Sequence, residues 1–191
     1  MEKLVEKILA AAAEKRPVIV LDGMCGSGKT TLAGALQKRL GLPIVRMDDF
    51  FLPFHLRTAE RLSQPGGNVD YERFAKEVLP NIGRGEAFTY QRFHCGDGTF
   101  SPVFCPAEGG CIVEGSYSLH PAFYPEWQKM GAVTVFLQVE EAEQLRRLEK
   151  RNPEMMENFR RRWIPMENAY FAAFDVPHKA RLCLKSEWTA E

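Results

Sequence analysis

The chain has 191 residues, of which 45% are hydrophobic and 26% are charged, and these values fit one globular domain. The composition excludes a disordered chain, a collagen-like repeat and a coiled coil. Lys and Arg together number 25, and so do Asp and Glu, which gives a formal net charge of zero. A neutral chain lacks the basic excess of a general nucleic-acid binder, so we expect no nucleic-acid partner. Any bound anion has to be held by a local site.

Two further features of the sequence concern where the protein acts. No apolar run approaches the ~20 residues needed to span a bilayer, and charges interrupt the apolar positions of residues 1–16. The five cysteines show neither a zinc pattern nor a disulfide framework, which favours idle thiols in a reducing compartment. We therefore predict a cytoplasmic protein with no membrane partner, and the sequence leaves a homo-oligomer open.

Strands and helices are expected to alternate along the chain. The first predicted elements are an amphipathic helix within 1–16, a buried strand at 18–21, a helix over 29–40 and a second strand at 44–47. The next are an irregular stretch over 50–69, a helix from Asp70 to about Asn81, and a hairpin or long excursion over 84–109. The last are strands at 111–113, 132–139 and 181–184, with helices over 140–151 and after Pro165. This alternation predicts an α/β fold with a parallel sheet covered on both faces.

The strongest motif lies between the first predicted strand and the helix after it. Residues 23–30 match the pattern G-x-x-x-x-G-K-[ST] at every fixed position. In such a loop, backbone amides and the helix N-terminus cradle phosphate oxygens. Lys29 is placed to reach the β- and γ-phosphates, and the Thr30 hydroxyl is a ligand for Mg²⁺. The predicted nucleotide-binding residues are Gly23, Met24, Cys25, Gly26, Ser27, Gly28, Lys29, Thr30 and Thr31.

Several other classes of nucleotide-binding protein do not fit. A dinucleotide pattern G-x-G-x-x-G starting at Gly26 needs a glycine at the position of Thr31. The Asn-Lys-x-Asp motif of GTPases and the Ser-Gly-Gly signature of transporter-type ATPases are both absent from the sequence. Acids instead follow two other predicted strands, at Asp48 and Glu114. In an open α/β sheet, such strand ends converge on the ligand.

Together these residues resemble the uridine kinase-like family of P-loop small-molecule kinases. The matching segments are 23–31, 47–51, 68–70, 113–115 and the arginine-rich stretch after the predicted strand at 132–139. The resemblance implies a P-loop NTPase three-layer sandwich formed by the whole chain, 1–191, with a mostly parallel five-stranded sheet and an Arg-rich lid at about 151–163. It also implies transfer of the γ-phosphoryl group from ATP, with Mg²⁺, to a hydroxyl of a small nucleoside-like molecule such as uridine or cytidine.

The resemblance assigns roles to individual residues. It implies that Asp48 is the general base for the attacking hydroxyl, although a turn or cap remains an alternative for the pair Asp48-Asp49, and Asp49 is interpreted as structural. Glu114 stands where a Walker-B acid would help Thr30 to hold Mg²⁺. The predicted catalytic residues are Asp48, Lys29, Arg147 and Arg151, with one of Arg160, Arg161 and Arg162 also facing phosphate.

The acceptor is assigned to the excursion at about 84–109 and to nearby residues. Asp70 stands where the family binds ribose hydroxyls, but a helix N-cap explains it equally well. The predicted substrate-binding residues are Asp70, Tyr90, Phe51 and His94. Because residues 88–105 differ from the uridine kinases, two alternatives stay open. One is a kinase for pantothenate or a sugar phosphate, and the other is a nucleotide-dependent switch or assembly ATPase with no small acceptor.

Overall fold

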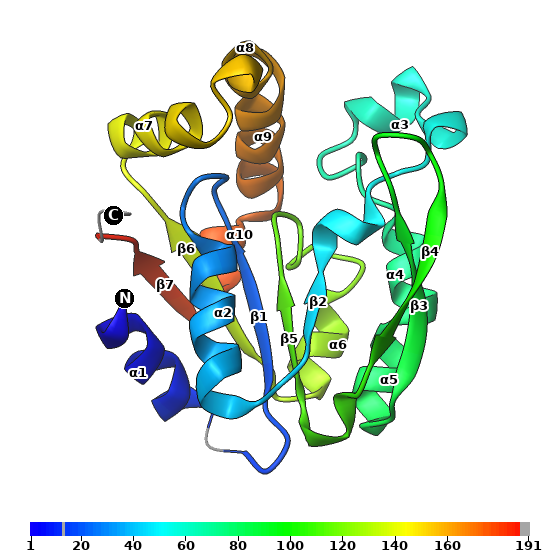
Figure 1. Ribbon diagram of the computed structural model, residues 1–191, viewed down its shortest axis with the longest axis vertical. Helices are drawn as coiled ribbons and strands as arrows, with labels where there is room; N and C mark the ends of the chain where they lie inside the picture. Colours follow the sequence, from blue (N-terminus) through cyan, green and yellow to red (C-terminus); the bar gives the residue numbers. More distant parts are fainter. Residues whose placement is uncertain (13, 188–191) are drawn as a thin grey trace.

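The computed structural model describes residues 1–12 and 14–187, which are built around one five-stranded sheet (Figure 1). The strand order is β2-β5-β1-β6-β7, and every pairing in the sheet is parallel. This arrangement confirms the predicted α/β fold with a mostly parallel five-stranded sheet. The strands are β1 (Val18–Gly23), β2 (Ile44–Arg46), β5 (Cys111–Glu114), β6 (Val133–Gln138) and β7 (Leu182–Lys185).

Helices surround the sheet and follow the predicted order with several differences. A helix at Tyr124–Lys129 was not predicted. The helix expected from Asp70 to Asn81 is two helices, because the chain breaks at Val78 before a new first turn that contains Pro80. The stretch 50–69, expected to be irregular, contains a short helix. The helices are α1 (Glu2–Ala11), α2 (Lys29–Leu40), α3 (Ala59–Ser63), α4 (Tyr71–Glu77), α5 (Leu79–Arg84), α6 (Tyr124–Lys129), α7 (Glu141–Arg151), α8 (Met156–Asn158), α9 (Ile164–Phe174) and α10 (Val176–Lys179).

Two hydrophobic cores explain why the start of β1 is a continuous apolar run. Successive side chains of a strand point to opposite faces, so a strand covered on both sides needs apolar residues at every position. Ile19 and Leu21 lie in one core with buried residues of α1 and α2. Val18 and Val20 lie in the other core with buried residues of α4, α5, α6 and α9. The fold is therefore the three-layer sandwich that the sequence predicts.

A two-stranded hairpin stands apart from the main sheet (Figure 1). Its antiparallel strands are β3 (Phe88–Phe93) and β4 (Phe100–Cys105), which confirms a hairpin within residues 84–109. Beside it, Phe51 forms an antiparallel bridge with Val69, so both ends of the intervening segment are tied together. Within the described ranges, none of the helices combines the length and apolar character that crossing a membrane requires.

The predicted lid consists of short helical pieces between α7 and α9. A 3₁₀ turn, Pro153–Met155, leads into α8, and a π-helical segment, Phe159–Trp163, leads directly into α9. π-Helical turns are rare and occur frequently at functional sites. This segment carries the run of three arginines.

Candidate active site

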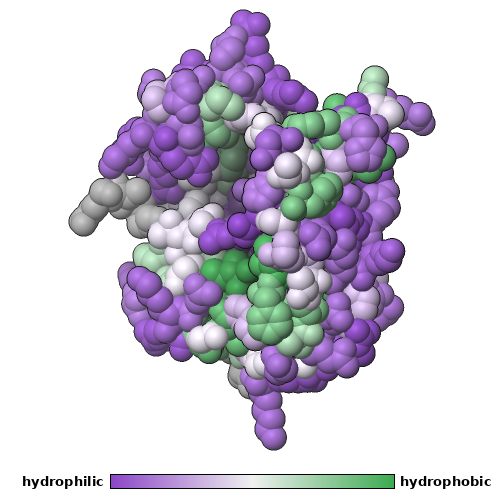
Figure 2. All heavy atoms as spheres, turned by 45° about the vertical axis from the view of Figure 1, so that its right-hand side comes forward, coloured by the Kyte–Doolittle hydropathy of each residue, from purple (hydrophilic) through white to green (hydrophobic). Residues whose placement is uncertain are grey.

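A pocket of about 800 Å³ opens at the carboxyl ends of the parallel strands. Residues that follow β1, β2 and β5 line its floor, and residues of α7, the π-helical segment and α9 line its other side. The space-filling view shows a hollow between the lid side and the α3 side of the molecule (Figure 2). This is the position where open α/β sheets bind their ligands.

The loop at residues 23–30 has the conformation that its pattern predicts. Gly28, the N-cap of α2, has φ of 94°, which lies in the left-handed region that favours glycine. The Lys29 ammonium donates hydrogen bonds of 2.7 and 2.9 Å to the carbonyl oxygens of Gly23 and Met24. Of the predicted nucleotide-binding residues, those that line the pocket are Cys25, Gly26, Gly28, Lys29, Thr30 and Thr31. Those that do not line it are Gly23, Met24 and Ser27.

Side chains from α7 and α9 hold the backbone of this loop. The Gln144 amide donates to the carbonyl oxygen of Cys25 at 2.8 Å. The Arg147 guanidinium, predicted to face phosphate, donates to the carbonyl oxygens of Gly26 and Ser27 at 3.2 Å each. From α9, the Glu167 carboxylate accepts a 2.8 Å hydrogen bond from the backbone amide of Cys25. Arg147 thus lies at the edge of the pocket and braces the loop.

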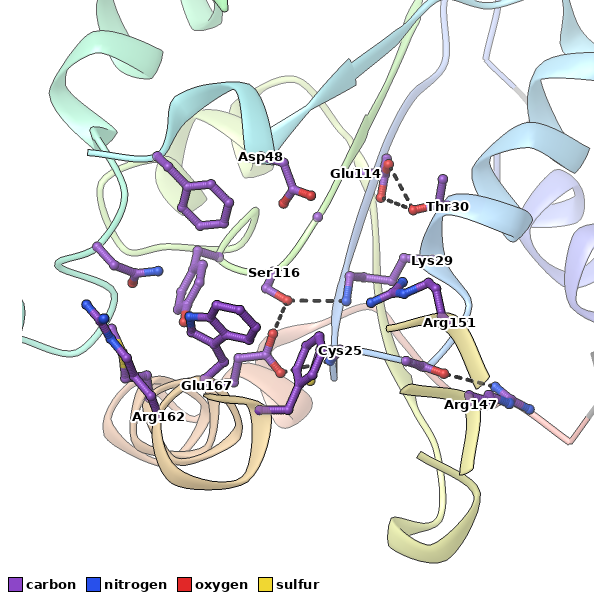
Figure 3. A pocket seen from close by; sticks show the side chains of 18 of the residues that line it. Cys25, Lys29, Thr30, Asp48, Glu114, Ser116, Arg147, Arg151, Arg162 and Glu167 are labelled. Carbon is purple, nitrogen blue, oxygen red and sulfur yellow. Dashed lines mark hydrogen bonds between the residues drawn. The ribbon is translucent and has the colours of Figure 1, made fainter. Parts of the chain in front are cut away.

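The predicted metal ligands lie together. The Thr30 hydroxyl is 3.2 Å from Oε1 of Glu114, and Arg46 donates to the same oxygen at 2.8 Å (Figure 3). Burial, and then the nearby charge of Asp48, raise the pKa of Glu114. A hydroxyl and a carboxylate beside a phosphate cradle fit Mg²⁺, which prefers oxygen ligands and usually keeps phosphate or water in its shell.

The acidic pair after β2 divides into two environments. Asp48 points into the pocket, on the side facing Lys29 and Ser116 (Figure 3). The surrounding protein desolvates this carboxylate and raises its pKa, an effect that the charge of Lys29 opposes. Asp49 is buried and accepts hydrogen bonds of 2.7 Å from the Tyr90 hydroxyl and from Nε of Arg92. These contacts agree with the structural interpretation of Asp49.

Cations gather on the lid side of the pocket. The predicted Arg151 lines it, and so does Arg162, whereas Arg160 and Arg161 do not. Arg162 lies on the opposite side of Glu167 from Arg147 and Arg151 (Figure 3). Two further cations of α7 also line the pocket and were not predicted from the sequence, Arg146 and Lys150.

Three of the predicted acceptor residues do not line this pocket. Asp70 caps α4, because its carboxylate accepts from the backbone amide of Arg73 at 3.0 Å. Tyr90 faces the core and stacks on Phe50, with ring centroids 5.2 Å apart. The His94 ring is 2.7 Å from the Ser101 hydroxyl within the hairpin. Hairpin alternation and helix capping account for these residues.

Other residues complete the lining of the pocket. Phe51 lines it as predicted, together with Arg57, Asn68, Tyr117 and Trp163. The side-chain oxygen of Asn68 is buried and has no hydrogen-bond partner within the described part of the chain. Its place in the segment 68–70, which matches the uridine kinase-like family, was the sequence signal for it.

A buried acid directly before the loop also escaped the sequence analysis. The Asp22 carboxylate accepts from the backbone amides of Gly23, Tyr117 and Leu119 at 2.6, 3.1 and 2.9 Å. Tyr117 has φ of 77°, a strained conformation for a residue with a side chain, and Asp22 helps to hold it. The sequence does carry a signal for Asp22, because this residue is the single acid in the otherwise apolar strand β1. Burial raises the pKa of Asp22 to about 6.

Two solved structures with a similar fold are described as possible kinases. One is described as a possible uridine kinase from Bacillus stearothermophilus, with a TM-score of 0.69, 21% identity, and 96% of each chain covered. Another, from Silicibacter sp. TM1040, is provisionally described as a fructose transport system kinase, with a TM-score of 0.65 and 23% identity over 95% of this chain and 97% of that one. At these identities the likeness concerns the fold alone.

The sequence has no significant match among curated proteins. The family described as "AAA domain" matches residues 19–164, which include the phosphate-binding loop, Asp48, Glu114 and the predicted lid. The chain therefore belongs to this AAA domain family and has a P-loop kinase-like fold.

Proposed function

We propose that the protein is a phosphotransferase that uses ATP and Mg²⁺ to phosphorylate a hydroxyl of a small molecule. The observation that carries this proposal is the direction of Asp48, whose carboxylate points into the same pocket as Lys29 and Thr30. Phosphoryl transfer depends mainly on positioning and charge neutralisation, with one carboxylate to accept the proton of the alcohol.

The residues of the pocket divide the work between them. Lys29 and the loop amides bind the phosphates, and the lid cation Arg151 offsets charge on the transferring group. Thr30 and Glu114 hold Mg²⁺, which when bound neutralises phosphate charge. Asp48 takes the proton from the hydroxyl group of the acceptor molecule and orients the oxygen of that hydroxyl. The approach of lid residues to the loop excludes water, which limits idle hydrolysis.

We infer that the acceptor is a nucleoside of the uridine or cytidine type. The resemblance of the motifs to the uridine kinase-like family supports this class. The pocket supplies aromatic faces for a base at Phe51, Tyr117 and Trp163, and the unpartnered oxygen of Asn68 can accept from a ribose hydroxyl or a base N–H.

A second candidate acceptor carries an anionic group, as a sugar phosphate or pantothenate does. Arg57 and Arg162 both line the pocket, and Arg162 lies away from the loop. Guanidinium groups are well suited to bind phosphate or carboxylate in two-point contacts. This observation favours the second candidate specifically.

The test measures ADP release from ATP with a panel of nucleosides, sugar phosphates and pantothenate. Release that depends on one acceptor class supports the kinase and identifies the class. Hydrolysis that needs no acceptor, or that a partner protein stimulates, supports a switch or assembly ATPase instead. A Lys29→Ala variant is the control, because it should lose phosphoryl transfer with either acceptor class. The cytoplasmic location and a homo-oligomeric state stay predictions.

A further inference from the structure

Glu167 places a buried carboxylate inside the phosphate-binding loop. It lies in the first turn of α9, and 5% of its surface is exposed. One carboxylate oxygen accepts the 2.8 Å hydrogen bond from the amide of Cys25. The other lies 2.5 Å from the hydroxyl of Ser116 (Figure 3). Within the described residues, both hydrogen bonds of this carboxylate are therefore made on the side of the phosphate-binding loop.

The same groups belong to the machinery that binds phosphate. Cys25 lies within the loop whose amides converge on phosphate oxygens. The Ser116 hydroxyl accepts a 3.3 Å hydrogen bond from the Lys29 ammonium, so one hydroxyl separates Glu167 from the lysine that reaches the β- and γ-phosphates. Glu167 thus contacts a loop amide and approaches the lysine as a phosphate oxygen would.

The negative charge of Glu167 is felt by its neighbours. It contributes, after burial, to the raised pKa of the Cys25 thiol and of the Tyr117 hydroxyl. A phosphate group entering the loop would meet the same field. Two anions in one partly desolvated site repel each other, and within the described residues no salt bridge joins Glu167 to a cation.

We propose that Glu167 is an internal carboxylate that competes with the phosphates of the nucleotide for the Cys25 amide and so weakens their binding. The inference rests on the proposed function only in requiring that the loop binds a nucleotide. Phosphate binding displaces the carboxylate from the loop.

The test compares Glu167→Gln with the wild type. Glutamine keeps the size of the side chain and an oxygen that can accept from Cys25, but it removes the charge. Titration calorimetry with Mg²⁺ present, and with no acceptor, measures the dissociation constants of inorganic tripolyphosphate and of a non-hydrolysable ATP analogue. The proposal expects both constants to fall at least fivefold in Glu167→Gln.

The matched control is Glu157→Gln, which removes the same charge from an exposed acid in the lid. It should change either constant less than twofold, and an equal gain in both variants would overturn the proposal, because the effect would then be general. Unchanged or weaker binding in a folded Glu167→Gln would overturn it too, since Glu167 would then only support the loop. If no variant binds either ligand, the proposed function fails together with this inference.

Discussion

The hydroxyl of Tyr170 donates a 2.8 Å hydrogen bond to the carboxylate of Asp22, across 148 positions of sequence. This contact joins the end of β1, directly before the phosphate-binding loop, to the helix that carries Glu167. It means that the packing of α9 and the conformation of the loop depend on one buried carboxylate. Both sides of the pocket are therefore coupled through the core as well as across the cavity.

Removing this hydroxyl should destabilise the fold. Tyr170→Phe deletes one hydrogen bond to a buried carboxylate, and we expect it to lower the free energy of unfolding by about 1–2 kcal/mol. Denaturant unfolding measures the change. Tyr124→Phe is the matched control, because that hydroxyl donates at 2.8 Å to an exposed backbone carbonyl, and it should cost less than about 1 kcal/mol. Equal losses in the two variants would contradict the role given to Asp22.

Replacing Asp48 or Asp49 with asparagine should have different effects, on turnover in the first case and on stability in the second. Asp48→Asn should lower kcat by about 10²–10⁴-fold while leaving stability and binding of an ATP analogue intact, since it removes only the proton acceptor. Asp49→Asn should instead lower the free energy of unfolding by about 2 kcal/mol, because it weakens the contacts with Tyr90 and Arg92. Turnover near the wild-type value in a folded Asp48→Asn would refute the assignment of the base.

The activity should fall in acid at a higher pH than an ordinary aspartate would give. Asp48 acts as a base only when ionised, and desolvation raises its pKa, so kcat/KM is lost as the pH drops through this raised value. Lys29 lowers this pKa, whereas Asp49 and Glu167 raise it. Glu167→Gln should therefore move the acid limb of the pH–rate profile to lower pH. A limb that stays in place would show that Asp48 does not set it.

The metal requirement should depend on Glu114. We expect Glu114→Gln to raise the half-saturating Mg²⁺ concentration by about tenfold or more, because an amide is a weaker ligand than a carboxylate. Chelation of the metal should abolish turnover in the wild type. Initial rates over a Mg²⁺ series measure both effects, and an unchanged half-saturation value would place the metal elsewhere.

Two adjacent lid arginines offer a paired test of acceptor binding. Arg162 lines the pocket, whereas Arg161 is exposed and pairs with Glu157. Arg162→Ala should raise the KM for an anionic acceptor by about tenfold, and Arg161→Ala should leave it near the wild-type value. An equal rise for a neutral nucleoside acceptor would count against the second candidate function.

The phosphate-binding half of the pocket was predictable because it depends on local sequence. The loop pattern fixes its own backbone conformation, and the strand ends before Asp48 and Glu114 follow from short apolar runs. The residues on the proposed acceptor side could not be predicted in the same way, because the orientation of their side chains depends on tertiary packing. Tyr90 was expected at the ligand, but the register of the hairpin turns it towards Asp49.

The sequence contains a signal that could have identified Glu167 as a site residue. Glu167 is the one charged residue of Ile164–Phe174, and a lone acid among apolar residues needs partners when it is buried. The sequence does not reveal that those partners are Cys25 and Ser116, because the contacts join elements more than fifty residues apart. Such long-range pairings come from the packing of α9 over the strand ends.

The bridge between Phe51 and Val69 also has a use in redesign. The bridge joins the two ends of the segment 52–68. The length and composition of this segment can therefore be altered at small entropic cost. Arg57 and Asn68 lie within it, whereas the groups that grip phosphate come from outside. If the proposed function holds, grafting other segments between Phe51 and Val69 therefore offers a way to change the acceptor without altering the phosphate-binding loop.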